Sequence, residues 1–280
     1  DNTEVQDYLY YSARHYDGLT DNGRAQDISS SSNKIVSSNT INYNTSFGLH
    51  NINLLAGFEA EKNLTNFVRA TGRGIGNADL PFVSAAGKFD ANAYNWGYNM
   101  LSVLSRAEYN YDDTYYAAAS YRKDGASKLG PDSRWGDFWS ISGALNLKKI
   151  ALQENNTINA LRLKGSYGVN GTLPTSDFGW RRLINYTYNY KGQPGGFIVS
   201  NPDENIRWET SYTSNIGLEF GLFNNRLTGS VEYFNRTSKD LLQDVPTSFT
   251  TGFNTVLRNV GQINNKGIEI ELGGDIIKKQ

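Results

Sequence analysis

Alternation of apolar and polar side chains is the feature that most constrains this sequence, and residues 115–147 show it most clearly. One face of the first segment holds Tyr115, Ala117, Ala119 and Tyr121, and the other holds Tyr116, Ser120 and Arg122. Trp139, Ile141 and Leu145 alternate with small or polar residues in the second segment. Side chains of a strand point alternately to two faces, so both segments predict half-buried strands. The Gly-rich loop between them has turn chemistry, which completes a hairpin.

The same pattern recurs along the chain and predicts an all-β, antiparallel protein of about ten strands. High aromatic and glycine content favours the same class. Connections rich in Gly, Asn and Asp separate the strands, and longer ones alternate with shorter ones. The longer ones are expected at Asp17–Asn39, Asn66–Asn99, Asn170–Asn205 and Lys239–Lys266, and the shorter ones at His50–Asn51, Asp112–Asp113, Lys148–Asn159 and Asn224–Asn225.

The composition excludes several classes of function. Cysteine is absent and the two histidines, His15 and His50, are far apart, so disulfides, thiol nucleophiles and histidine metal sites have no support. A net charge of −1 gives no basic patch for nucleic acid. No run of about 18 apolar residues predicts a transmembrane helix. The mean hydropathy of −0.54 fits a soluble protein, and also a membrane β-barrel, in which only alternate strand residues face lipid.

Strand length and loop length favour a transmembrane β-barrel over a soluble β-sandwich or propeller, which stays the alternative. Outer-membrane barrels have short turns on one side and long loops on the other, and soluble strands are usually about 5–6 residues long. Aromatic residues near strand ends on the apolar face would form an interfacial girdle; these are Tyr109, Tyr111, Tyr115, Trp208 and Phe220.

Ordered short motifs then narrow the prediction to a family. The hairpin contains YRKDGAS at 121–127, LG at 129–130, RWG at 134–136 and FWS at 138–140, followed downstream by LRLKGSYGVNG at 161–171, IRWET at 206–210, NRL at 225–227, NVG at 259–261 and NNKGIE at 264–269. This order resembles SusC/RagA-type TonB-dependent outer-membrane transporters of the Bacteroidetes, over roughly residues 40–275. Trp139 stands where that family usually has proline, so strand geometry there is expected to differ.

The resemblance implies TonB-dependent import of a large nutrient, an oligosaccharide (glycan) or a peptide, across the bacterial outer membrane. It implies a SusD-like surface lipoprotein and TonB as partners, contact with outer-membrane lipid, no nucleic acid, no cofactor and no enzymatic chemistry. Residues 1–280 are expected to form part of a 22-stranded plugged barrel, with the plug, TonB box and terminal strands outside this chain. A passive outer-membrane porin is the alternative, and a soluble carbohydrate-binding β-protein a weaker one.

Two groups of residues are candidates for function. The hairpin motif is predicted to be structural, with its arginines paired to carboxylates; its members are Arg122, Asp124, Gly125, Ser127, Arg134, Trp135 and Gly136. Aromatic side chains of the long loops are candidates for substrate binding, with self-packing of those loops as the alternative; they are Trp96, Tyr98, Trp180, Tyr186, Tyr188 and Tyr190. Strand carboxylates such as Glu219 are expected to line the lumen, and alternation places Leu163 toward lipid and Lys164 toward the lumen.

Overall fold

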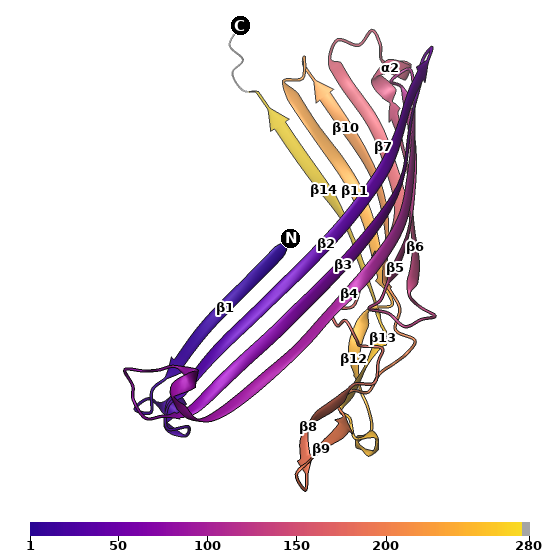
Figure 1. The fold of residues 1–280 in the computed structure, drawn as a ribbon. Coiled ribbons are helices and arrows are strands. Elements are labelled where there is room, and N and C mark those ends of the chain that lie inside the picture. Colours follow the sequence, from indigo (N-terminus) through magenta and orange to yellow (C-terminus); the bar gives the residue numbers. More distant parts are fainter. Residues whose placement is uncertain (276–280) are drawn as a thin grey trace. The chain divides into compact units, whose positions relative to one another are not determined.

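The computed structural model describes residues 1–275 and confirms an antiparallel, nearly all-β architecture with ten strands in one sheet. Hydrogen-bonded neighbours follow in the order β1, β2, β3, β4, β5, β6, β7, β10, β11, β14 (Figure 1). Their bounds are β1 Asn2–Tyr11, β2 Arg24–Phe47, β3 His50–Ile75, β4 Ala86–Tyr111, β5 Tyr115–Ala126, β6 Trp135–Asn146, β7 Ile158–Thr172, β10 Glu209–Leu222, β11 Leu227–Lys239 and β14 Gln262–Gly274.

Shorter elements occupy the connections. Two hairpins form separate two-stranded sheets, β8 with β9 and β12 with β13. The bounds are α1 Tyr16–Leu19, η1 Val83–Ala85, α2 Leu147–Ala151, β8 Ile184–Tyr190, β9 Gln193–Ile198, β12 Leu242–Pro246, η2 Phe249–Thr251 and β13 Thr255–Asn259. Two of the expected long loops, Asn170–Asn205 and Lys239–Lys266, therefore contain hairpins. Within residues 1–275, none of the helices is long and apolar enough to cross a membrane.

The prediction of a loop is wrong for two stretches of the chain, because strands occupy most of their residues. The stretch Asp17–Asn39 lies largely in β2, and Asn66–Asn99 lies largely in β3 and β4. β2 carries Ser29–Ser32, whose residues pair with β1 residue by residue, for example Val5 opposite Ser30. Backbone hydrogen bonds sustain such a strand without an apolar face, so alternation alone does not reveal it. Trp96 and Tyr98 consequently lie on β4 and not in a loop.

The chain divides into two compact units, and each is described by itself. The first contains Asp1–Ser37 and Ala60–Asn99, and the second contains Ser38–Glu59 and the chain from Met100 onward. The second unit holds β5, β6, β7, β10, β11 and β14 with all of their connections, including both hairpin insertions.

The strands of the second unit have two chemically opposite faces. Leu145, Leu163, Leu218, Val231 and Ile270 are lateral partners across β6, β7, β10, β11 and β14, and so share one face. This apolar face exposes many large side chains, among them Ile141, Leu145, Ile216, Leu218, Val231, Tyr233, Ile268, Ile270 and Leu272. The opposite, polar face carries the alternating partners Ala144, Lys164, Gly217, Glu232 and Glu269.

The two ends of these strands also differ (Figure 1). At the turn end, residues 112–114 and 223–226 make tight turns and α2 lies between β6 and β7. Left-handed backbone at Asp112 and Asp113 (φ 50° and 49°) suits a tight hairpin. At the loop end lie residues 127–134 and the insertions 173–208 and 240–261. The expected alternation of loop lengths fails once, because the α2 connection, 147–157, is longer than the loop 127–134.

The buried core of the second unit sits at the loop end. Its members are Ala126, Leu129, Phe138, Val169, Ile206 and Trp208, with Met100, Leu173, Tyr212, Leu242 and Leu257 packed against them. Trp208 is 7% exposed, its ring lies edge-on to Phe138 at 5.2 Å, and its indole N–H donates to the Arg134 carbonyl oxygen (3.2 Å). The expectation that Trp208 belongs to an exposed girdle is wrong, because β10 begins one residue later and alternation does not extend to Trp208.

Candidate functional site

Arg122 joins three neighbouring strands of the polar face. Its Nε donates to Asp124 Oδ1 (2.6 Å), and its Nη2 donates to Glu59 Oε1 (3.0 Å) and Ser102 Oγ (2.8 Å). Asp124 is 8% exposed and Ser102 only 1%. Charge-assisted bonds of this length are strong, and the planar guanidinium fixes their directions. The hairpin motif thus forms a cross-strand brace between β3, β4 and β5.

Arg134 departs from the expectation that both motif arginines pair with carboxylates. The structure gives it no ion pair within residues 1–275, and its Nε is buried without an acceptor. Its carbonyl oxygen instead accepts the Ala126 amide (3.1 Å) and the Trp208 indole N–H. Arg134 therefore joins the loop to the buried core through its backbone, a role that side-chain chemistry does not predict.

The motif glycines leave room for aromatic rings. A Cβ on Gly125 would lie 2.7 Å from the ring of Trp135, and a Cβ on Gly136 would lie 2.5 Å from the ring of Phe138. Phe138 also covers Gly171 on the neighbouring strand. Contacts this short exclude any side chain, so the rings require glycine. Ser127 contributes its carbonyl oxygen, which accepts the indole N–H of Trp180 (3.2 Å).

Ion pairs and amide contacts join the three loop-end segments to one another. Lys128 pairs with Asp177 (3.0 Å), Arg258 with Asp203 (3.1 Å), and Arg207 with Asp240 (2.6 Å). The hydrogen bond to the Asp240 carboxylate raises the pKa of Arg207. Asn259 accepts the Arg207 amide (2.9 Å) and donates to the Arg207 and Asp240 carbonyls. These contacts make the base of the insertions an ordered platform.

The candidate aromatic residues divide between the two units. Trp96 and Tyr98 belong to the first unit, where Trp96 packs against Tyr94 (5.5 Å) and the Tyr98 hydroxyl donates to Glu61 (2.5 Å). Trp180 belongs to the second unit and is half-buried, with Arg181 4.6 Å from its ring centroid. These three rings are therefore already engaged within the protein.

The three tyrosines of β8 are the exposed members of the set. Tyr186, Tyr188 and Tyr190 are 67%, 59% and 71% exposed. A register shift between Asn185 and Tyr188 interrupts the alternation of this strand. Tyr188 contacts Phe197 edge-on (4.4 Å), and Tyr186 lies against Gly196 and Ile184. Tyr186 thus faces the opposite side from Tyr188 and Tyr190, and no single face presents all three rings.

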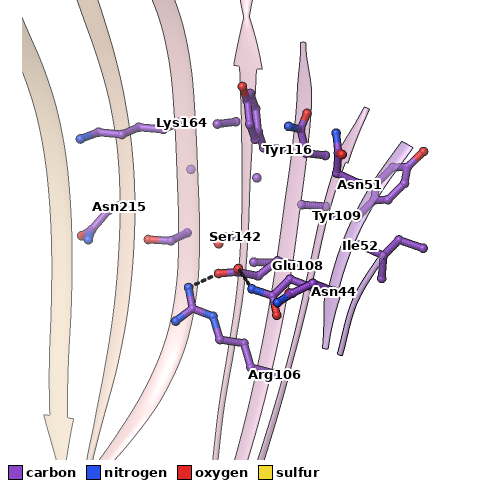
Figure 2. Close-up of a pocket in the computed structure, with 18 of the residues that line it drawn as sticks. Asn44, Asn51, Ile52, Arg106, Glu108, Tyr109, Tyr116, Ser142, Lys164 and Asn215 are labelled. Atoms are coloured by element: carbon purple, nitrogen blue, oxygen red, sulfur yellow. Dashed lines mark hydrogen bonds and ion pairs between the residues drawn. The ribbon is translucent and has the colours of Figure 1, made fainter. Parts of the chain in front are cut away.

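The polar face of the second unit forms a cavity of about 830 Å³ (Figure 2). Amide and hydroxyl side chains, among them Asn44, Ser46, Asn51, Asn53, Asn110, Ser142, Ser166 and Asn215, line it together with alanine and glycine. Its charges are paired within it. Arg106 pairs with Glu108, which also accepts Asn53 Nδ2 (3.2 Å), and Lys164 bridges Glu219 (3.0 Å) and Glu232 (3.1 Å). The charged residues that line the cavity are thus ion-paired, and the amides and hydroxyls beside them can form many hydrogen bonds.

Sequence reasoning identified Lys164 and Glu219 as polar-face residues but missed that Lys164 bridges two carboxylates. The bridge depends on lateral register, since β10 places Gly217 beside Lys164 and β11 places Glu232 beside Gly217. A metal centre has no comparable support. No group of three potential metal ligands occurs among residues 1–275.

Comparisons with known proteins agree with this architecture. The family profile "TonB dependent receptor-like, beta-barrel" matches residues 1–276. TonB-dependent receptor P3 of Formosa agariphila is 29% identical over 88% of this chain, and this match covers 25% of that receptor. TonB-dependent receptor SusC of Bacteroides thetaiotaomicron is 30% identical over 65% of this chain and 19% of its own length. The chain spans about a quarter of the length of the curated relatives it matches.

Solved structures show the same relationship. The RagAB peptide transporter superposes with a TM-score of 0.86 at 28% identity, over 92% of this chain and 29% of that one. The ferric-catecholate receptor Fiu of E. coli superposes with a TM-score of 0.52 at 11% identity, which supports the fold alone. The two-faced antiparallel sheet and the match over nearly its whole length show that this chain belongs to the TonB-dependent receptor β-barrel family of the bacterial outer membrane.

Proposed function

We propose that the protein containing this chain imports a large nutrient across the outer membrane with energy supplied through TonB, and that residues 1–280 form part of its barrel wall. The observation that carries the proposal is the opposition of the two faces within a receptor-family barrel. The apolar face exposes leucine, isoleucine and tyrosine to lipid, and the polar face presents a wall of amides, hydroxyls and paired charges to the lumen.

The plug and the TonB-contacting segment are proposed to lie in other parts of the polypeptide, since the matched relatives are about four times as long. A SusD-like surface lipoprotein is the proposed partner. The ordered platform at the loop end supports this, because loops fixed by ion pairs and buried side chains offer a preorganised docking surface. The similarity to SusC and to the RagAB complex supports it further.

The substrate is proposed to be an oligosaccharide or a peptide. The amide and hydroxyl side chains that line the cavity of the polar face suit either class, and the structural relative RagAB is described as a peptide transporter. Among the aromatic candidates, Tyr186, Tyr188 and Tyr190 are proposed as the contact residues at the loop end because they are exposed. Trp96, Tyr98 and Trp180 are secondary candidates because the fold already engages their rings.

Uptake by cells that carry the full-length receptor tests the proposal. We expect uptake of a labelled oligosaccharide or peptide to require the receptor, TonB and the membrane proton gradient, and to weaken when the lipoprotein is deleted. Uptake that persists without TonB would contradict the proposal and favour the passive porin. If cells that lack the receptor grow poorly only on iron chelates, TonB-dependent import would stand. The proposed substrate class, an oligosaccharide or a peptide, would then be wrong.

The tyrosines are tested in the same assay. We expect alanine at Tyr186, Tyr188 and Tyr190 together to raise the substrate concentration for half-maximal uptake by at least about tenfold, since each ring contact contributes about 0.5–1.5 kcal/mol. Phe249→Ala is the matched control, because Phe249 is an exposed aromatic residue (85%) in the other insertion. If Phe249→Ala weakens uptake as much as the triple tyrosine variant does, the exposed rings influence the loops in general. The tyrosines would then not be substrate contacts.

A further inference from the structure

A second cavity, of about 410 Å³, lies on the apolar face and not in the lumen. Its lining is Tyr167, Tyr212, Ser214, Asn235, Thr237, Lys239 and Gln262. The strand register places all of these on one face, because Tyr167, Ser214 and Asn235 are lateral partners, as are Tyr212 with Thr237 and Lys239 with Gln262. This is the face that carries Leu163, Leu218 and Val231 further toward the turn end. We name these seven residues and the adjacent Lys266 the outer groove.

The outer groove begins where the band of outward-facing apolar side chains, here called the apolar belt, ends. On β14 the belt runs from Leu272 to Ile268, and the next outward residue toward the loop end is Lys266. On β6 the belt extends further, to Trp139, and the next outward residue is Asp137. The border therefore runs obliquely across the strand register, as it must when strands tilted by about 35–45° cross a flat bilayer. This places the groove at the level of the lipid headgroups on the loop side.

The charges of the outer groove are unbalanced. Lys239 Nζ lies 5.2 Å from the ring centroid of Tyr212, and Lys266 is exposed. Neither lysine has an ion pair within the described residues, and this face of β7, β10, β11 and β14 carries no carboxylate. Lys123, which also points outward near the loop end, is instead paired with Asp137 (3.4 Å). Cations at a membrane surface that lack a carboxylate partner are complementary to anionic headgroups.

The polar groups between the two lysines are neutral and held in place. Asn264 Nδ2 donates to Asn235 Oδ1 and to Thr237 Oγ1, both at 2.7 Å, which fixes these side chains. Lys239 and Lys266 lie four positions apart in the strand register, or about 14 Å along the strands at about 3.4 Å per residue. Two ammonium groups separated in this way suit a ligand with two anionic groups joined by a hydroxyl-rich spacer.

We propose that the outer groove binds the headgroup of an outer-leaflet lipid that carries two phosphates on a saccharide. Lys239 and Lys266 each contact one phosphate, the amides and hydroxyls between them contact the sugar hydroxyls, and Tyr167 and Tyr212 pack against the saccharide. The acyl chains then lie along Ile216, Tyr233 and Ile268, which continue the same face toward mid-bilayer. This site is separate from the lumen and does not depend on the imported substrate.

Native mass spectrometry of the full-length receptor with added diphosphoryl lipid A tests the proposal. Each lysine near the surface contributes about 1 kcal/mol, so we expect Lys239→Gln or Lys266→Gln to weaken binding about fivefold and the double variant about 25-fold. The monophosphoryl lipid should bind the wild type about fivefold more weakly. Inorganic phosphate should not compete, because it lacks the acyl chains.

Lys123→Gln is the matched control and should bind lipid as the wild type does, since its charge is neutralised by Asp137. Heat modifiability on gels verifies that every variant forms the barrel. Wild-type affinity in the double variant, or an equal loss in Lys123→Gln, would overturn the proposal. Equal affinity for the diphosphoryl and monophosphoryl lipids would overturn the assignment of two phosphates.

Discussion

Leu163 and Lys164 are adjacent in sequence and lie on opposite faces of β7, and their environments show how this fold uses alternation. Leu163 lies between Leu145 and Leu218 on the face that meets lipid. Lys164 bridges Glu219 and Glu232 on the face that meets the lumen. We expect the apolar face to tolerate little polarity in mid-strand, and the polar face to tolerate many substitutions except near the buried core at the loop end.

A substitution in the buried core at the loop end should have the largest effect on stability. Trp208→Ala removes a 7% exposed ring from the core around Phe138 and leaves the Arg134 carbonyl with the Ala126 amide but without the indole N–H. We expect the free energy of unfolding of the full-length protein to fall by about 3–5 kcal/mol. Urea unfolding in lipid vesicles, followed by tryptophan fluorescence and gel mobility, measures this loss. A loss below about 1 kcal/mol would mean that Trp208 is exposed in the membrane.

Leu163→Arg tests the lipid-facing side. An arginine near mid-bilayer costs about 2–4 kcal/mol in an outer-membrane barrel, so we expect a corresponding loss of stability and reduced assembly in cells. Surface-exposed receptor, quantified by extracellular protease or antibody access, reports assembly. Normal assembly of Leu163→Arg would show that this face does not meet hydrocarbon.

Arg122→Gln tests the brace on the polar face. The substitution leaves the Asp124 and Glu59 carboxylates without their guanidinium, and we expect a loss of about 1–3 kcal/mol. Asp124→Asn in the same background should restore part of the loss, because it removes the unpaired buried charge. If the double variant is no more stable than Arg122→Gln, the pair does not act as a unit.

Lys164→Gln should have the smallest effect. The lysine and its two carboxylates are partly exposed to the lumen, and such pairs contribute about 0–1 kcal/mol. We expect normal assembly and less than about 1 kcal/mol of lost stability in the unfolding assay. A loss as large as that of Leu163→Arg would contradict the assignment of opposite faces.

Alternation in the sequence predicts the faces of this fold because it reports directly which side chains share an environment. The long serine-containing part of β2 escapes prediction because neither of its faces is apolar. Trp208 is misassigned because its parity matches β10 although the strand has not begun there. In both places the pattern of apolar and polar residues along the sequence does not match the environment of the side chains in the folded structure.

The candidate site could be predicted only in part. The motif RWG marks residues that prove to lie around the loop-end core, but the exposed and engaged aromatic residues look alike in sequence. The Lys164 bridge and the outer groove depend on lateral register, which joins residues of strands far apart in the chain. A single sequence contains no direct signal for that register.

Paired accessibility measurements along β7, β10 and β11 test the two-faced barrel most directly. The sequence has no cysteine, so single cysteines at positions 163 and 164, 218 and 219, and 231 and 232 can carry spin labels. In the full-length receptor in vesicles, we expect dissolved oxygen to increase the relaxation rate of labels at 163, 218 and 231 the most. We expect a water-soluble nickel complex to increase the relaxation rate of labels at 164, 219 and 232 the most. Equal accessibility within each pair would contradict the barrel wall described here.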